Sequence, residues 1–205
     1  MTEEFDRAFW EERYRRHRGS GAGEPNPHLV AEVGELAPGS ALDVGCGEGA
    51  EAMWLASRGW RVTATDIAAS ALERARRHAE ILGDGVADRI EWVRTDLTGK
   101  SAWERCFDLV TAHYVHPAGS PEEMLASLAA AVAPGGTLFV VGHHPSDQRH
   151  ASSAEAYVAA ERLAAELTPE RWEVVVAETR SRPAGGHHGH GTTLWDSVLR
   201  ARRRA

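Results

Sequence analysis

The sequence predicts an α/β fold, namely a single doubly wound, mostly parallel sheet with a C-terminal antiparallel hairpin. Two observations support this prediction. Short apolar runs of β type alternate with helix-type patterns between residues 40 and 142, as in successive βαβ units. After residue 167, two β-type runs follow each other without a long helix between them, which favours an antiparallel pair.

The N-terminal residues 1–24 are predicted to form a helix and a flexible joint. Trp10 and Tyr14 lie one helical turn apart within the pattern from Glu3 to Arg18, and the glycines at 19–23 break that pattern. Asn26 then caps a second helix that starts with Pro27. Its expected apolar stripe is Leu29, Val30, Val33 and Leu36.

The central segments alternate regularly. They are, in order, a strand at 41–44, a helix at 51–57, a strand at 60–65, a helix at 68–82, strands at 89–95 and 107–114, a helix at 120–132 and a strand at 137–142. Ser120 and Glu123 form a capping-box pattern, and Leu82 is expected to face inward. Pro134-Gly135-Gly136 predicts a turn before the fifth strand.

The last segment, residues 143–205, begins a new pattern. A helix is predicted at 154–167, followed by strands at 172–179 and 193–201. The residues between these strands, 183–191, are rich in glycine and histidine and predict a surface loop.

Composition and charge limit the class of protein. Hydrophobic residues at 42% and charged residues at 26% are typical of a globular domain. The formal net charge of −7 argues against nucleic acid or a membrane as the main partner, because both attract basic surfaces. Cys46 and Cys106 have no disulfide or metal-type spacing. We therefore expect a cytoplasmic domain, a monomer or homodimer, that acts on a small molecule.

A glycine loop follows the first predicted strand. Gly45, Gly47 and Gly49 bring backbone N–H groups at a helix start close to a polar or charged ligand. With Ala50 in the third position, the same loop also satisfies the dinucleotide-binding fingerprint. The loop alone therefore predicts an adenosine cofactor without choosing between two enzyme classes.

Acidic residues end the next two strands. Asp66 can accept hydrogen bonds from both ribose hydroxyls of an adenosine, although by itself it is also a plausible helix cap. Asp96-Leu97 offers a carboxylate for an exocyclic amine and an apolar contact for a base. Because the carboxyl ends of parallel strands share one edge, these groups are expected to meet the glycine loop there.

These segments resemble the class I S-adenosylmethionine-dependent methyltransferases between about Ala41 and Val141. Residues 42–49 are similar to the first motif of that family, residues 62–67 to its ribose-binding strand, and Asp96-Leu97 to its adenine contact. The resemblance implies a Rossmann-like methyltransferase fold with S-adenosyl-L-methionine as cofactor and S-adenosyl-L-homocysteine as product.

Further segments extend this resemblance. Residues 107–110 resemble the fourth strand of the family, and residues 133–138 resemble the turn into its fifth. The aromatic N-terminal helix, Asn26-Pro27 and residues 172–203 look similar to a small-molecule branch that includes tellurite-resistance and thiopurine methyltransferase-like proteins.

The resemblance also implies roles for individual residues. Asp43 and the backbone from Gly45 through Cys46 and Gly47 to Gly49 would face the methionine part. Asp66 would bind the ribose, and Ile67, Asp96 and Leu97 would frame the adenine. Trp10 and Tyr14 would close over the cofactor as a lid, and His113 and Tyr114 would lie near the transferable methyl. Ordinary packing of an amphipathic helix explains the two aromatic residues equally well.

Histidines follow two neighbouring strands. His113 and His116 follow the fourth strand, and His143 and His144 follow the fifth, so all four are expected at the carboxyl edge as candidate catalytic bases. Hydrogen-bonded loop histidines are the alternative. The run His187-His188-Gly189-His190 has a metal-binding composition but no rigid ligand geometry, so we predict no metal.

The function predicted from these features is transfer of a methyl group to a sulfur, nitrogen, oxygen or chalcogen atom of a small molecule. We expect one methyltransferase domain over residues 1–205, with its cofactor-binding core at 40–142. A nicotinamide-dependent oxidoreductase is an alternative, although Lys100 is the single lysine and no Tyr-x-x-x-Lys pair exists. A non-catalytic S-adenosylmethionine-binding module is the second alternative.

Overall fold

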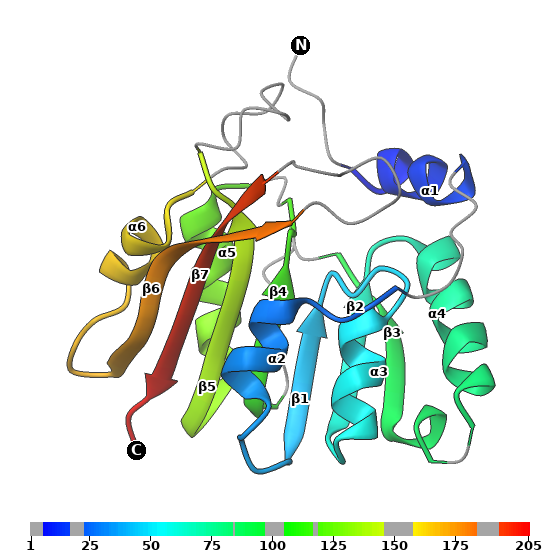
Figure 1. Cartoon of the computed structure of the whole chain (residues 1–205), viewed down its shortest axis with the longest axis horizontal. Helices are drawn as coiled ribbons and strands as arrows, with labels where there is room; N and C mark the ends of the chain where they lie inside the picture. Colours follow the sequence, from blue (N-terminus) through cyan, green and yellow to red (C-terminus); the bar gives the residue numbers. More distant parts are fainter. Residues whose placement is uncertain are drawn as a thin grey trace.

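A seven-stranded sheet forms the centre of the molecule, with the strand order β3-β2-β1-β4-β5-β7-β6 (Figure 1). The computed structural model describes residues 6–16, 23–83, 85–96, 105–116, 119–145, 158–183 and 193–205. The strands are β1 (Ser40–Val44), β2 (Arg61–Asp66), β3 (Ile90–Arg94), β4 (Phe107–His113), β5 (Val132–His143), β6 (Trp172–Pro183) and β7 (Thr193–Arg203). β1 to β5 pair in parallel, and β7 pairs antiparallel with both β5 and β6. The predicted fold class is therefore confirmed.

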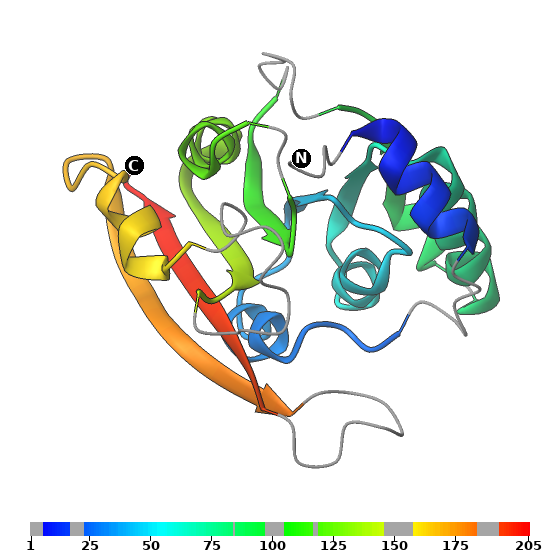
Figure 2. The same cartoon turned by 90° about the horizontal axis from the view of Figure 1, so that it is seen from above.

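Helices cover both faces of this sheet. They are α1 (Arg7–Arg16), α2 (Pro27–Val33), α3 (Ala50–Ser57), α4 (Ala69–Ile81), α5 (Pro121–Ala130) and α6 (Ala160–Ala165), with a 3-10 turn at Ala87–Arg89. Figure 2 looks down onto the carboxyl edge and shows α2 and α3 on one side of the sheet and α5 on the other. α1 lies over this edge beside α4.

Two apolar cores result, one on each face. Leu29, Leu55 and Phe139 belong to the core under α2, α3 and α4, while Leu125 and Leu138 belong to the core under α5 and α6. Successive residues of β5 alternate between the two cores, which explains the nearly continuous apolar run at 137–142. Each fully buried leucine contributes about 1.5–3 kcal/mol to folding.

Two predicted core positions are wrong. Val30 is 40% exposed, and Leu82 is 59% exposed at the C-cap of α4, directly before Gly83, whose φ of 86° ends the helix. The N-terminal signals are confirmed, since the Asn26 side chain accepts the N–H of His28 and Ser120 forms a full capping box with Glu123.

The predicted turn at Pro134-Gly135-Gly136 lies inside β5 rather than before it. Phe107 pairs with Val132 and Leu109 pairs with Thr137, so the residues between the β5 partners bulge outward. A methyl group added at Gly136 would lie 3.0 Å from the carbonyl oxygen of Phe107. Gly136 therefore allows β5 to interrupt its pairing with β4 and to resume it at Thr137.

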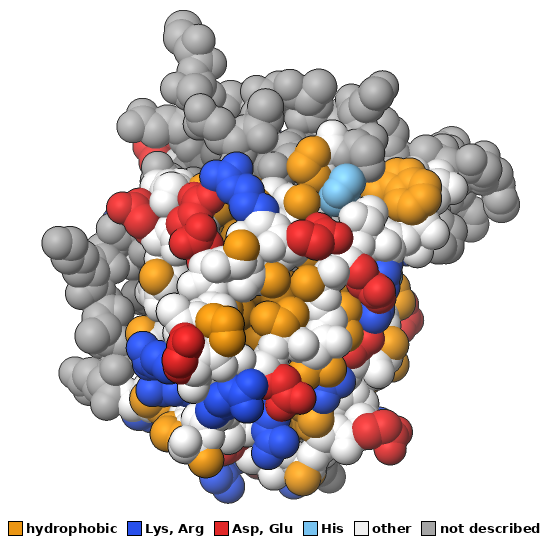
Figure 3. All heavy atoms as spheres, turned by 90° about the vertical axis from the view of Figure 1, so that its left-hand side faces the viewer, with side chains coloured by type: hydrophobic (Ala, Val, Ile, Leu, Met, Phe, Trp, Pro, Cys, Tyr) orange, Lys and Arg blue, Asp and Glu red, His pale blue; other side chains and the backbone are white. Residues whose placement is uncertain are grey.

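The hairpin strand β6 forms one edge of the sheet. Figure 3 shows apolar side chains on this side of the molecule surrounded by arginine and acidic side chains. Val174 and Val175 are 42% and 48% exposed, and charged neighbours of this kind discourage pairing with a second sheet. Among the helices that the structure describes, none combines the length and apolar character needed to cross a bilayer.

Candidate active site

The glycine loop leaves β1 in left-handed backbone conformations. The φ angles of Gly45, Gly47 and Gly49 are 67°, 53° and 87°. A methyl group added at Gly45 would lie 2.6 Å from Cγ2 of Val115, and one at Gly49 would lie 2.6 Å from the ring of Trp92. Backbone angle and close packing together therefore require glycine at these two positions.

Asp66 joins this loop to the end of β2. Its Oδ2 accepts the N–H of Gly47 at 2.9 Å, and its Oδ1 accepts the N–H of Ala68 at 2.8 Å. Burial raises the pKa of Asp66, against the lowering effect of backbone hydrogen bonds from Ala68, Gly47 and Ile67. The carboxylate thus fixes the spacing between the glycine loop and the start of α4, beside Ile67.

Asp43 lies in β1, directly before the loop, and is 1% exposed. Its carboxylate accepts a backbone hydrogen bond from Ala52, but its Oδ2 has no hydrogen-bond partner among the described residues. Burial, then the charges of Glu51 and Asp66, hold the pKa of Asp43 well above its usual range. Burial likewise raises the pKa of the Cys46 thiol. Among the described residues, the charges that act most strongly on Asp43 and Cys46 come from acidic groups.

The helix α1 is attached to α4 by its polar residues. The Glu11 carboxylate accepts the N–H groups of Ala69 and Ser70, at 3.0 and 3.2 Å, at the start of α4. Arg74 donates to the Tyr14 carbonyl oxygen and to Glu48, the latter at 2.8 Å. These contacts link α1 to both α4 and the glycine loop.

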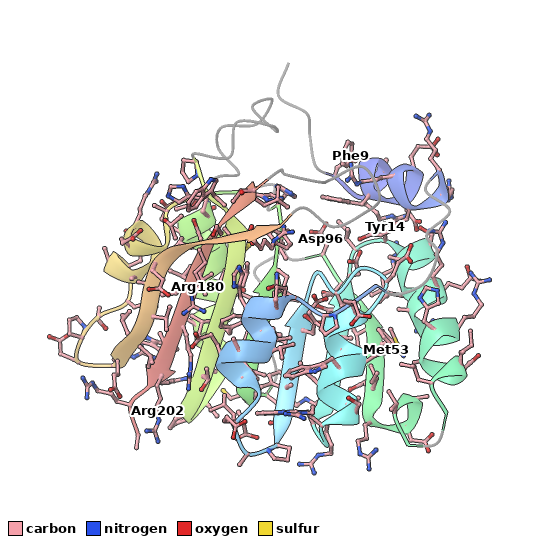
Figure 4. The ribbon with its side chains drawn as sticks, in the orientation of Figure 1. Phe9, Tyr14, Met53, Asp96, Arg180 and Arg202 are labelled. Atoms are coloured by element: carbon pink, nitrogen blue, oxygen red, sulfur yellow. The ribbon has the colours of Figure 1, made fainter. Side chains whose placement is uncertain are left out.

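Tyr14 covers the middle of the glycine loop. A methyl group added at Gly47 would lie 2.8 Å from the Tyr14 hydroxyl oxygen. Burial and the nearby Asp66 carboxylate raise the pKa of the Tyr14 phenol. Figure 4 shows Tyr14 and Asp96 at the same edge of the sheet, below α1. Asp96 is exposed after the end of β3, and Leu97 lies outside the described residues.

Aromatic rings form a continuous stack across the edge of the sheet. Trp10 stacks on His116 at 5.9 Å between centroids, His116 on His143 at 6.2 Å, and His143 on Tyr114 at 4.5 Å. The structure therefore brings His116 and His143 together beneath α1.

The other two candidate histidines have different surroundings. The ring of His113 packs 5.8 Å from that of Phe139, beside the Thr111 hydroxyl. Burial lowers the pKa of His113, more strongly than the neighbouring Glu51 raises it. His144 is linked to β7 by its backbone N–H, which donates to the Trp195 carbonyl oxygen at 2.9 Å.

A polar network beside this stack was not predicted from the sequence. Tyr114 is the one non-glycine residue with positive φ (52°) in the described ranges, and its hydroxyl donates to Asp196 Oδ2 at 2.9 Å. The same oxygen accepts Nε of Arg182 at 2.6 Å and Nε2 of His28 at 3.2 Å. Asn26 donates to the Tyr114 hydroxyl at 3.1 Å. An acidic residue within a buried strand was the only signal of this network in the sequence.

The metal prediction is not tested by the structure. His187, His188 and His190 lie outside the described residues. Among the residues that are described, no three or more histidine, cysteine or acidic side chains gather as a metal site would require.

Comparisons with known proteins agree with this geometry. Residues 41–136 match the methyltransferase domain family. A release factor glutamine methyltransferase from Chlorobaculum tepidum is 41% identical over 90 residues, which are 43% of this chain and 26% of that protein. A ubiquinone biosynthesis O-methyltransferase from Xanthomonas euvesicatoria is 32% identical over 155 residues, 75% of this chain and 56% of that protein.

A solved structure extends the similarity to nearly the whole fold. The N-methyltransferase NodS from Bradyrhizobium japonicum, crystallised with S-adenosyl-L-homocysteine, matches with a TM-score of 0.71 and 20% identity, over 98% of this chain and 100% of that chain. The chain spans 11–56% of the length of the curated relatives that it matches. Residues 41–136 of this chain therefore match the methyltransferase domain family, and the fold of the chain is that of the class I, Rossmann-like S-adenosylmethionine-dependent methyltransferases.

Proposed function

We propose that the protein transfers the methyl group of S-adenosyl-L-methionine to a heteroatom of a small molecule and releases S-adenosyl-L-homocysteine. The observation that carries this proposal is the hydrogen-bonded connection between the glycine loop and Asp66, with buried Asp43 next to it. A glycine loop at a helix start and an acidic residue at the next strand end are the elements that hold an adenosine cofactor in such folds.

The residues present fit this cofactor. The unpartnered Oδ2 of Asp43 suits the ammonium of the methionine part, since a cation would balance the buried acidic charge. Each oxygen of Asp66 accepts one backbone N–H and can accept a second hydrogen bond, which suits the ribose hydroxyls. Asp96, Leu97 and Ile67 would frame the adenine.

We further propose that α1 is a lid. Tyr14 covers Gly47, and Trp10, one turn earlier on α1, stacks on His116 at the same edge of the sheet. In this division of the chain, residues 1–24 contain the lid and joint, 40–142 the cofactor-binding core, and 143–205 the C-terminal helix and hairpin.

The bound cofactor supplies a methyl group that is already activated, so the protein has mainly to align the acceptor and exclude water. Trp10 and Tyr14 would exclude water from the site. His116 and His143 are the candidates to accept a proton when the acceptor is a hydroxyl or a protonated amine. His113, which burial keeps neutral near pH 7, and His144 are further candidates at the same edge.

A small acceptor is supported by charge, because a net −7 opposes binding to nucleic acid. We propose a cytoplasmic protein that works as a monomer or homodimer.

Calorimetry tests the cofactor first. The purified protein should bind S-adenosylmethionine and S-adenosylhomocysteine but not NAD, and binding of NAD alone would overturn the proposal. Asp66→Ala should weaken S-adenosylhomocysteine binding more than tenfold, because two hydrogen bonds to a charged group are lost. Asp88→Ala, at an exposed acidic residue of the 3-10 turn, is the matched control.

A turnover screen then tests the acceptor. Thiols, selenium and tellurium oxyanions, phenols and azoles cover the chemistry of candidate nucleophiles. With any acceptor that is methylated, His116→Ala and His143→Ala should lower turnover at unchanged cofactor affinity. Full activity in both variants would remove them as bases.

A further inference from the structure

A small cavity of about 40 Å³ lies on the face of the sheet that α5 and α6 cover. Its walls are apolar side chains at the carboxyl ends of β4 and β5 and on the two helices, including Ala112, Met124 and Leu163. This is the face opposite to that of α3, so the cavity is separate from the Asp43 side of the cofactor site.

Ser197 supplies the one side-chain hydroxyl of this lining. The residue is 3% exposed, and its Oγ has no hydrogen-bond partner among the described residues. A buried hydroxyl without a partner costs about 1–3 kcal/mol. The mostly apolar wall favours an apolar guest over a trapped water, which would need two to four polar partners.

Gly142 keeps the cavity open. It lies in β5, opposite Ser197 of β7, and a methyl group added to it would meet no atom within 4 Å. Its φ is outside the left-handed region, so the backbone does not require glycine here. Because glycine in a strand interior costs stability, the missing side chain needs another reason, and space for a ligand is one.

Val115 connects the cavity to the cofactor loop. Its side chain lines the cavity, and its Cγ2 lies 2.6 Å from the point where a methyl group at Gly45 would stand. One side chain therefore separates the cavity from the backbone that would hold the methionine part of the cofactor.

We propose that this cavity binds a short aliphatic group of the methyl acceptor, with the Ser197 hydroxyl bonded to a heteroatom of that group. The inference rests on the proposed function and narrows its substrate to small aliphatic thiols, alcohols or amines. The volume limits the enclosed part of the acceptor to about one or two heavy atoms, since the six carbons of benzene occupy an engineered cavity of about 150 Å³.

Two kinds of variant test the proposal with methanethiol as the probe and phenol as a control that is too large for the cavity. Calorimetry at saturating S-adenosylhomocysteine should detect the thiol in the wild type but not phenol. Gly142→Val should weaken thiol binding at least tenfold and Gly142→Ala less, because both fill the cavity. Ser197→Ala should weaken it about fivefold, whereas Ser181→Ala, on the exposed surface of β6, should change nothing.

The outcomes separate this inference from the proposed function. S-adenosylhomocysteine affinity should stay within twofold of wild type in every variant, which also shows that each is folded. If the wild type binds S-adenosylhomocysteine but not the thiol, the cavity does not bind the acceptor. A higher free energy of unfolding for Gly142→Val than for the wild type would then identify the cavity as a packing gap. Either result would contradict this inference and leave the proposed function intact. Equal thiol affinity in the wild type and both Gly142 variants would likewise place the thiol elsewhere. Failure to bind S-adenosylhomocysteine at all would instead defeat the proposed function.

Discussion

Replacing Asp196 by Asn removes a fully buried charge that accepts hydrogen bonds from α2, β6 and the residue after β4. Three donors converge on its Oδ2: the Tyr114 hydroxyl, the Arg182 guanidinium and the His28 ring. Hydrogen bonds to a charged group are worth about 1.5–3 kcal/mol each and neutral ones about 1 kcal/mol. Because an amide oxygen still accepts, we expect a loss of about 3 kcal/mol, near the lower end for a broken buried ion pair.

The loss of stability caused by Asp196→Asn should become smaller as the pH falls. Burial raises the pKa of Asp196, but hydrogen bonds from His28 and Arg182 and the Arg182 charge outweigh it and hold the pKa below 3.8. A carboxyl group whose pKa is lowered on folding stabilises the protein above its unfolded pKa, and this contribution disappears as the pH falls through the folded pKa. The difference between wild type and Asp196→Asn should therefore be full at pH 7 and shrink below pH 3.8.

Urea unfolding at pH 7 and at lower pH measures this difference directly. Glu178→Gln is the matched control, since Glu178 pairs with Arg180 on the exposed part of the same hairpin, where such a pair is worth under about 1 kcal/mol. A loss at pH 7 no larger than that of the control, or one that persists unchanged in acid, would refute the reasoning.

Three further substitutions probe the lid, the loop and a helix cap. Glu11→Gln should weaken the attachment of α1 to α4 and raise the S-adenosylhomocysteine Kd about threefold, measured by calorimetry; an unchanged Kd would argue against a lid. Gly49→Ala, at φ 87° and against Trp92, should cost about 2–3 kcal/mol in urea unfolding, and a neutral result would contradict the packing described. Ser120→Ala should cost about 1 kcal/mol but leave cofactor affinity unchanged.

Much of the fold was predictable because its signals are local. The alternation of strands and helices, the Asn26 and Ser120 caps and the glycine loop each depend on residues a few positions apart. Errors occurred where a helix ended early, as at Leu82, and where a turn sequence was absorbed into a strand, as at Gly136. The left-handed Gly83 ended α4 one residue before the prediction, whereas the pairing of β5 with β4 decided the second boundary.

The candidate site also contains residues that local sequence signals predict and contacts that they do not. Asp43, Asp66 and the loop glycines were identifiable because short spacings and strand ends bring them to one edge. The sequence did not indicate that Tyr14 would cover Gly47, or that His116 and His143 would stack while His113 packs against Phe139.

By itself the sequence determined the order of elements, the sheet class and the kind of cofactor, since these follow from periodicity and from motifs within single βα units. Only the tertiary structure decided which distant groups meet. Asp196 lies 82 positions from Tyr114 and 168 from His28, and Ser197 meets Gly142 only through the antiparallel pairing of β7 with β5. Such contacts depend on strand order and register, which local residue preferences do not specify.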